Sequence, residues 1–97
     1  MNIKFVWDEH KAVRNLQKHQ ISFEMATRIF ADPFALAYQD RIENGEYRWQ
    51  TIGMVDGCLL LLAAHTTEEN NDTEIIRIIS ARRADPKERK RYEQAIR

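Results

Sequence analysis

Arginines within and directly after an apolar segment are the residues of this chain best suited to chemistry. Arg77 lies between isoleucines in residues 75–79, and Arg82 and Arg83 follow this segment just before a helix signal. A guanidinium group stays charged in proteins and is costly to bury unpaired, so it needs either a carboxylate of the protein or an anionic ligand. A structural ion pair and a phosphate site are therefore the two interpretations of this segment.

Further candidate groups lie on predicted strands. Glu46 and Arg48 are two residues apart, so in a strand both side chains point to one face. They could act as an acid or base and a phosphate clamp, or form an exposed cross-strand pair. His65 ends an apolar segment, where its imidazole could transfer protons or simply hydrogen-bond at the strand end. Arginines that stabilise charge on phosphate oxygens, together with such proton carriers, are compatible with cleavage of a phosphodiester without a metal.

The sequence has no motif for a metal ion or a nucleotide cofactor. Its three histidines lack the spacing of metal ligands, and no glycine-rich loop precedes a helix. We therefore expect no cofactor and no metal. The single cysteine, Cys58, excludes an internal disulfide, and we predict that it lies in the core.

The composition is that of a folded protein with an uneven charge distribution. The chain has 97 residues, 43% of them hydrophobic and 31% charged, so we expect one domain over residues 1–97. Because no apolar stretch approaches the roughly 20 residues needed to cross a bilayer, we expect a cytoplasmic protein. From Arg82 onward, seven basic residues face three acidic ones although the net charge is zero. This asymmetry suits an anionic ligand at this end, or a solvated helix face.

Periodicity and turn residues predict the order of the elements. A strand at residues 3–7 leads to a helix at 8–19 capped by Asp8, and Ser22 caps a second helix that ends near residue 32. In the first helix, residues 12, 13 and 16 form the apolar side and residue 15 belongs to the polar side. The pairs Asn44-Gly45 and Asp56-Gly57 separate strands at 34–42, 47–55 and 58–66, followed by a polar loop at 67–73 and a strand at 74–80. A capping box formed by Asp85 and Glu88 predicts a last helix at 86–96. This order predicts an antiparallel meander.

The arrangement of particular residues along the chain resembles the BrnT family of bacterial type II toxins. The shared pattern consists of Phe5, Trp7, Asp8, Lys11, Asn15, Lys18 and His19, then Phe23, Ala26, Phe30, Asp32 and Pro33, then Glu46, Arg48 and Gly53, and finally residues 76–84 with Glu88, Arg89, Tyr92 and Glu93. One position departs from the pattern, because Gln20 stands where the family usually has a glycine after the Lys-His pair.

The resemblance implies a RelE-like α+β fold, with two N-terminal helices and a C-terminal helix packed on an antiparallel sheet. It implies an endoribonuclease toxin that inhibits translation and growth and is neutralised by a cognate BrnA-type ribbon-helix-helix antitoxin. We expect two toxins with two antitoxins, with operator DNA bound only through the antitoxin and no contact with a membrane. A rival hypothesis is a non-catalytic interaction domain whose basic end docks an antitoxin.

The family pattern marks the candidate site residues except His65, which is a candidate from its place on a predicted strand. Those that we expect to act in catalysis, by stabilising the phosphate or moving protons, are Glu46, Arg48, His65, Arg77 and Arg82. Those that we expect to hold the RNA are Lys18, His19, Arg83 and Tyr92. Two of these assignments have structural alternatives, because Lys18 and His19 suit the carboxyl end of a helix dipole, and Tyr92 could pack on the sheet.

Overall fold

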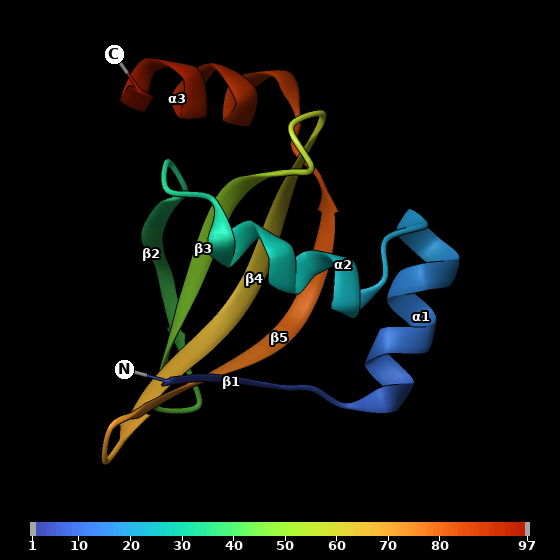
Figure 1. Ribbon diagram of the computed structural model, residues 1–97. Helices are drawn as coiled ribbons and strands as arrows, with labels where there is room; N and C mark the ends of the chain where they lie inside the picture. Colours follow the sequence, from blue (N-terminus) through green and yellow to red (C-terminus); the bar gives the residue numbers. More distant parts are fainter. Residues whose placement is uncertain (1, 97) are drawn as a thin grey trace.

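The computed structural model describes residues 2–96 and is an α+β fold (Figure 1). In chain order its elements are β1 (Asn2–Val6), α1 (Glu9–His19), α2 (Phe23–Thr27), the 3-10 helix η1 (Arg28–Ala31), β2 (Leu36–Glu43), β3 (Glu46–Val55), β4 (Leu59–Asn70), β5 (Thr73–Arg83) and α3 (Pro86–Ile96). No helix within these residues is long and apolar enough to cross a membrane.

Within residues 2–96 the strands form a five-stranded sheet in the order β1-β5-β4-β3-β2. The meander from β2 to β5 is antiparallel, as predicted. The turns at Asn44-Gly45 and Asp56-Gly57 have the positive φ angles of tight hairpins (53° and 80°, 54° and 73°). The α+β architecture is confirmed with one difference, because β1 runs parallel to β5 and the sheet is mixed.

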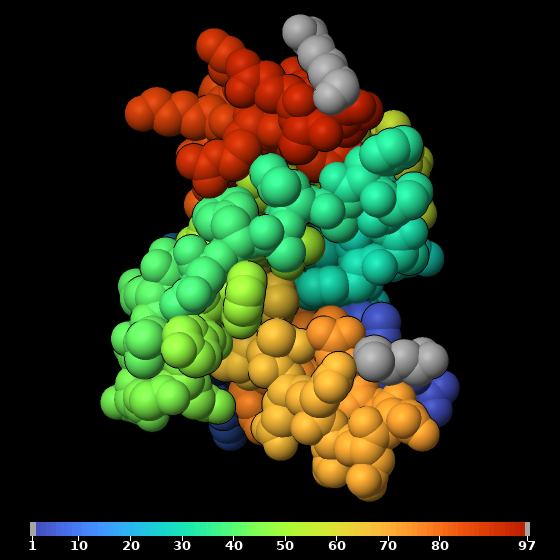
Figure 2. All heavy atoms as spheres, turned by 90° about the vertical axis from the view of Figure 1, so that its left-hand side faces the viewer, coloured from blue at the N-terminus to red at the C-terminus, as the bar shows by residue number. Residues whose placement is uncertain are grey.

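The predicted polar loop at residues 67–73 is wrong. β4 continues to Asn70, β5 begins at Thr73, and Asn71 takes a φ of 58° in the tight turn between them. In Figure 2 this hairpin, coloured gold to orange, forms the lower end of the molecule, far from α3 in red. Its side chains are mostly exposed. Strands at this distance from the core need no apolar residues, so a polar composition typical of a loop is also compatible with a strand here.

The two faces of the sheet differ in what covers them. Helices α2 and η1 lie across one face, with α1 beside β5 at its edge (Figure 1). We call this the covered face. Its core consists of Ile21, Phe23, Ala26, Ile29, Val55, Leu61, Ala63, Ile76, Ile78 and Ala81. On the opposite face, α3 packs at one end through Tyr92 against Ile52, Leu60 and Leu62. We call this second face the open face.

Gly53 lets η1 lie against the covered face. A Cβ at this position would be 2.8 Å from both Cβ and the carbonyl oxygen of Ile29. Real Cβ atoms do not approach other atoms so closely, and the backbone oxygen could not move away without displacing η1. The close approach of helix and sheet therefore depends on the missing side chain.

The prediction for the faces of α1 is right for Ala12, which packs against the core, but wrong for three other residues. Val13 and Leu16 are 53% and 50% exposed, whereas Asn15 is buried. The Asn15 amide donates to the carbonyl oxygens of Ile21 (2.9 Å) and Ala81 (2.8 Å), and its own oxygen accepts from the Ala81 N–H (3.0 Å). Because β1 pairs only with residues 73–77, the edge of β5 is free at Ala81, and the Asn15 side chain hydrogen-bonds there as a neighbouring strand would.

The helix ends follow the predicted caps. Asp8 and Ser22 accept hydrogen bonds from the first turns of α1 and α2, and Asp85 and Glu88 exchange the two bonds of a capping box. Gln20 ends α1 in the left-handed conformation, with a φ of 57°, where a glycine would be unstrained. The prediction that Cys58 lies in the core is wrong, because it is exposed directly after the turn at Asp56-Gly57.

Candidate functional site

The strand register places cationic side chains in a row across the open face. Arg41 of β2 pairs with Arg48 of β3, and Thr66 of β4 pairs with Arg77 of β5. Trp49 pairs with His65, so one further residue along both strands brings Arg48 beside Thr66. Paired residues share a face of a sheet. Arg41, Arg48, Thr66 and Arg77 therefore form one transverse row, which we call the arginine row.

A β-bulge sets which face Arg82 occupies. Counting by twos along a regular strand puts Arg77 and Arg82 on opposite faces. The register of β5 against β4 shifts between Ser80, paired with Ala64, and Ile78, paired with His65, which leaves Ile79 as the extra residue. Arg82 therefore pairs with Leu62 and shares the open face with Arg77.

Arg48 is a partly buried cation with few partners. Its side chain is 19% exposed, and its nearest carboxylate is that of Glu43, with 3.8 Å between Nη1 and Oε2. Among the described residues its buried Nε has no hydrogen-bond partner. A guanidinium in this state is stabilised by any anion that reaches it, because the desolvation cost is already present in the free protein.

Arg77 lies at one end of the arginine row, and Glu46 lies two residues from Arg48. Arg77 is exposed, and within residues 2–96 no carboxylate lies within ion-pair distance of it. Glu46, also exposed, points to the same face as Arg48, two residues away on β3. Beside Glu46, a cavity of about 370 Å³ separates the start of β3 from residues 66–68 of β4. The site thus offers a carboxylate next to guanidinium groups.

Arg82 is paired with a carboxylate. Its Nη1 and Nη2 donate to the two oxygens of Glu88, both at 2.8 Å, and Glu88 is also part of the α3 capping box. The hydrogen bond from Arg82 lowers the pKa of Glu88. The side chain of Arg82 is still 38% exposed, so one side of the guanidinium faces solvent. Arg82 is therefore held in a fixed position on the open face.

His65 lies on the other side of the sheet from the arginines. It is 4% exposed, its ring meets that of Phe30 edge-on with centroids 5.0 Å apart, and its Nε2 is 2.7 Å from the Thr51 hydroxyl. Nδ1–H can donate to the Thr66 carbonyl at 3.3 Å, which leaves Nε2 to accept from Thr51. Burial lowers the pKa of this imidazole. The expectation that His65 acts with Glu46 and Arg48 needs correction, because the sheet separates them.

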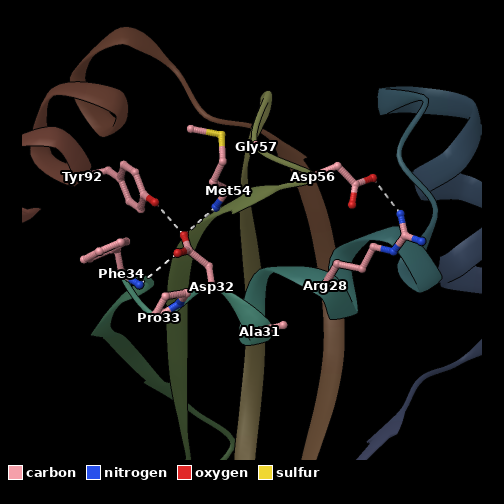
Figure 3. A pocket seen from close by; sticks show the side chains of 9 residues that line it. All are labelled: Arg28, Ala31, Asp32, Pro33, Phe34, Met54, Asp56, Gly57 and Tyr92. Atoms are coloured by element: carbon pink, nitrogen blue, oxygen red, sulfur yellow. Dashed lines mark hydrogen bonds and ion pairs between the residues drawn. The ribbon is translucent and has the colours of Figure 1, made fainter.

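Tyr92 is part of the core contact between α3 and the sheet. It is 4% exposed, and its hydroxyl donates to Oδ2 of Asp32 at 2.6 Å (Figure 3). Asp32 also accepts from the backbone N–H groups of Met54 and Phe34. Burial and the Asp32 carboxylate raise the pKa of Tyr92 to about 12. The ring has no free face for an RNA base, which corrects the expectation of stacking and leaves packing on the sheet.

The remaining three candidates divide between two places. Lys18 and His19 line a cavity of about 290 Å³ between α1 and the bulge of β5, together with Ser80. Ser80 pairs with Ala64 and so shares the face of the arginine row. Arg83 pairs with Leu61, which points it to the covered face, away from Arg82. The structure thus places Glu46, Arg48, Arg77 and Arg82 on one face of the sheet, with Arg82 five residues along β5 from Arg77, and puts Lys18 and His19 beside Ser80 of the same strand.

Sequence reasoning missed several residues of this region. Arg41 joins the arginine row because a bulge at Asp40 shifts the pairing of β2, and no sequence signal indicated that bulge. Glu88 was recognised as a cap, but not as the partner of Arg82. Among residues 2–96, no group of three or more His, Cys, Asp or Glu side chains is placed to hold a metal ion.

Comparison with known proteins assigns the family. A family model described as the ribonuclease toxin BrnT of a type II toxin-antitoxin system matches residues 7–88. The chain belongs to the BrnT family. The fold agrees with the crystal structure of the BrnT ribonuclease toxin of Brucella abortus, at 21% sequence identity and a TM-score of 0.59, over 87% of this chain and 99% of that one. A comparison with curated proteins gives no match.

Membership in the BrnT family gives the site its biological setting. The members are ribonuclease toxins of type II toxin-antitoxin systems, so this chain is a ribonuclease toxin with a cognate antitoxin. The matched region includes α1, the arginine row and the start of α3.

Proposed function

We propose that this BrnT chain is an endoribonuclease that cleaves RNA without a metal ion. The 2′-hydroxyl attacks the adjacent phosphorus, so a 2′-oxygen to phosphorus bond forms while the bond to the 5′-oxygen breaks. One proton leaves the 2′-hydroxyl and one reaches the 5′-oxygen. The products are a 2′,3′-cyclic phosphate and a free 5′-hydroxyl. Loss of transcripts then inhibits translation and stops growth until the antitoxin binds.

The observation that carries this proposal is the arginine row on the face that α3 leaves open. Arg41 pairs with Glu43 at 3.2 Å, whereas Arg48 is 3.8 Å from the same carboxylate and Arg77 has no ion-pair partner among the described residues. Arg48 and Arg77 lie two strands apart, about 10 Å between backbones at ~4.8 Å per strand, and their long side chains can converge on one phosphate. Negative charge grows on the phosphate oxygens in the transition state, and preformed donors of this kind stabilise it. Arg82, fixed by Glu88, is a third donor along the same strand.

Glu46 is the candidate for proton transfer. It is exposed on the same face as Arg48, whereas the buried, hydrogen-bonded His65 lies behind the sheet. A carboxylate at this place can act as the base that removes the 2′-hydroxyl proton. Lys18 and His19 hold the RNA strand next to the row.

Incubation of the purified toxin with a labelled RNA tests this function. We expect cleavage that persists in excess EDTA and leaves cyclic phosphate and 5′-hydroxyl ends, because the proposed donors are guanidinium groups. RNA left intact by folded protein would contradict the proposal and favour a non-catalytic docking domain. Cleavage that EDTA abolishes would refute the metal-free mechanism alone.

We further propose that the antitoxin is a BrnA-type ribbon-helix-helix protein and that two copies of each chain assemble. Operator DNA would then be bound by the antitoxin dimer and not by the toxin. The mass of the co-expressed complex in solution, measured by light scattering, tests the stoichiometry. A mass equal to one toxin and one antitoxin would contradict it.

A further inference from the structure

We propose that the cavity between α1 and the β5 bulge is a second phosphate site, which binds a neighbouring phosphate of the RNA strand whose scissile phosphate lies on the arginine row. The inference rests on the proposed function for its ligand. It adds Lys11, Arg14 and Ser80 to the RNA-binding surface. The cavity holds about 290 Å³, and these residues line it together with Lys18 and His19.

The cations of this cavity lie on one stripe of α1. Lys11, Arg14 and Lys18 are three and four residues apart, so their side chains are neighbours on the helix. The lining includes no acidic residue, and in the described part of the chain none of the three is within ion-pair distance of a carboxylate. Like charges at this spacing cost a helix a few tenths of a kcal/mol per pair. An anion in the cavity would remove this repulsion.

The helix dipole does not account for the stripe. Cations are favourable in the last turn of a helix, which explains Lys18 and His19. Lys11 lies in the first turn of α1, where the dipole favours negative charge, and Arg14 lies in the middle. A ligand that is itself negative explains all of these positions, whereas a purely structural role explains only the last turn.

The hydrogen bonds of Asn15 fix the direction of the stripe. Asn15 lies between Arg14 and Lys18 on the helix, and its amide is bonded to both backbone groups of Ala81. Ala81 directly follows Ser80 on β5. The cations next to Asn15 are therefore held around Ser80, whose hydroxyl is exposed and can donate to a phosphate oxygen.

The cavity continues the surface of the arginine row. Ser80 lies three residues from Arg77 on the same strand, about 10 Å at ~3.3 Å per residue, and both point to the open face. An RNA strand whose scissile phosphate contacts Arg77 can thus place a following or preceding phosphate at Ser80. This continuity favours RNA over an acidic segment of the antitoxin as the occupant.

A binding experiment with the double variant Lys11→Ala/Arg14→Ala tests the site independently of cleavage. The probe is a single-stranded DNA oligonucleotide, which lacks the attacking 2′-hydroxyl, followed by fluorescence anisotropy from 50 to 200 mM salt. We expect affinity to fall about tenfold and the slope of log affinity against log salt to decrease by ~0.7, the value for one lost phosphate contact of a single strand. Arg28 lies on η1 and is paired with Asp56, so Arg28→Ala should change neither the affinity nor the salt slope.

Single-turnover cleavage and antitoxin binding distinguish the remaining outcomes. At subsaturating enzyme the double variant should cleave RNA more slowly than the wild type, in proportion to its weaker binding of the strand. Wild-type affinity and salt slope in the folded double variant would overturn the inference. Loss of antitoxin binding with unchanged nucleic-acid binding would also overturn it and assign the cavity to the partner. If the wild type binds but never cleaves, the proposed function fails while the binding result still decides the second site.

Discussion

Replacing Asn15 with alanine should be among the most destabilising single changes in α1. The side chain makes three buried hydrogen bonds, at 2.8, 2.9 and 3.0 Å. Alanine leaves one N–H and one carbonyl of Ala81, and the carbonyl of Ile21, without these partners. An unsatisfied buried polar group costs about 1–3 kcal/mol, and carbonyls cost less than N–H groups, so we expect a loss of about 3–5 kcal/mol. This is a large share of the ~5–15 kcal/mol that typically stabilises a small domain.

Urea unfolding of Asn15→Ala measures this loss as a shift in midpoint at constant slope. Gln17→Ala, an exposed position on the same helix, is the control and should stay within about 0.5 kcal/mol of wild type. Asn15→Asp keeps the acceptor for Ala81 N–H but turns a carboxylate oxygen toward two carbonyls, so it should be at least as damaging at neutral pH. A loss below about 1 kcal/mol in Asn15→Ala would refute the view that this amide completes the edge of β5.

Three further changes probe the fold. Gly53→Ala should lower the free energy of unfolding by about 2–3 kcal/mol, because the new Cβ would meet the backbone of Ile29; an unchanged urea midpoint would show that η1 moves freely. Gln20→Gly should raise it by about 0.5–1 kcal/mol by relieving the left-handed φ of 57°, and a loss of stability would mean that the Gln20 side-chain bond matters more. Burial lowers the pKa of His65. Below pH ~6.5 the unfolded state therefore binds a proton at this residue that the folded state does not bind. The free energy of unfolding should fall on acidification by up to ~1.4 kcal/mol per pH unit. Urea midpoints at pH 7.5 and 5.5 should therefore differ less in His65→Gln than in wild type, and equal pH dependence would contradict this assignment.

Local sequence signals predicted most of the fold because each depends on few residues. The Asn44-Gly45 and Asp56-Gly57 turns and the Asp85-Glu88 capping box are where the pattern placed them. The prediction of a loop at residues 67–73 failed because a polar composition is found in strands far from the core as well as in loops. The role of Asn15 was missed for a related reason, since a polar residue was assigned to the surface, and only the short β1 reveals that the edge of β5 lacks a partner there.

The site was harder to predict because it depends on register. Glu46 and Arg48 share a face by simple alternation, which the sequence shows. Arg77 and Arg82 share a face only because of the bulge at residue 79, which period-two counting cannot anticipate. His65 was expected to end its strand, but β4 continues to Asn70, and the face that His65 occupies depends on which side of the sheet receives α2 and η1, a matter of tertiary packing.

The rate of RNA cleavage by Arg48→Ala, Arg77→Ala and the double variant, in single turnovers, tests the central claim that both guanidinium groups stabilise one scissile phosphate. Each single variant should lose about 10²–10³ in rate, and the double variant should lose less than the product of the two, because groups that act on one transition state are coupled. Arg28→Ala is the control, and melting temperatures confirm that each variant is folded. Folded single variants that both cleave at the wild-type rate would contradict the claim.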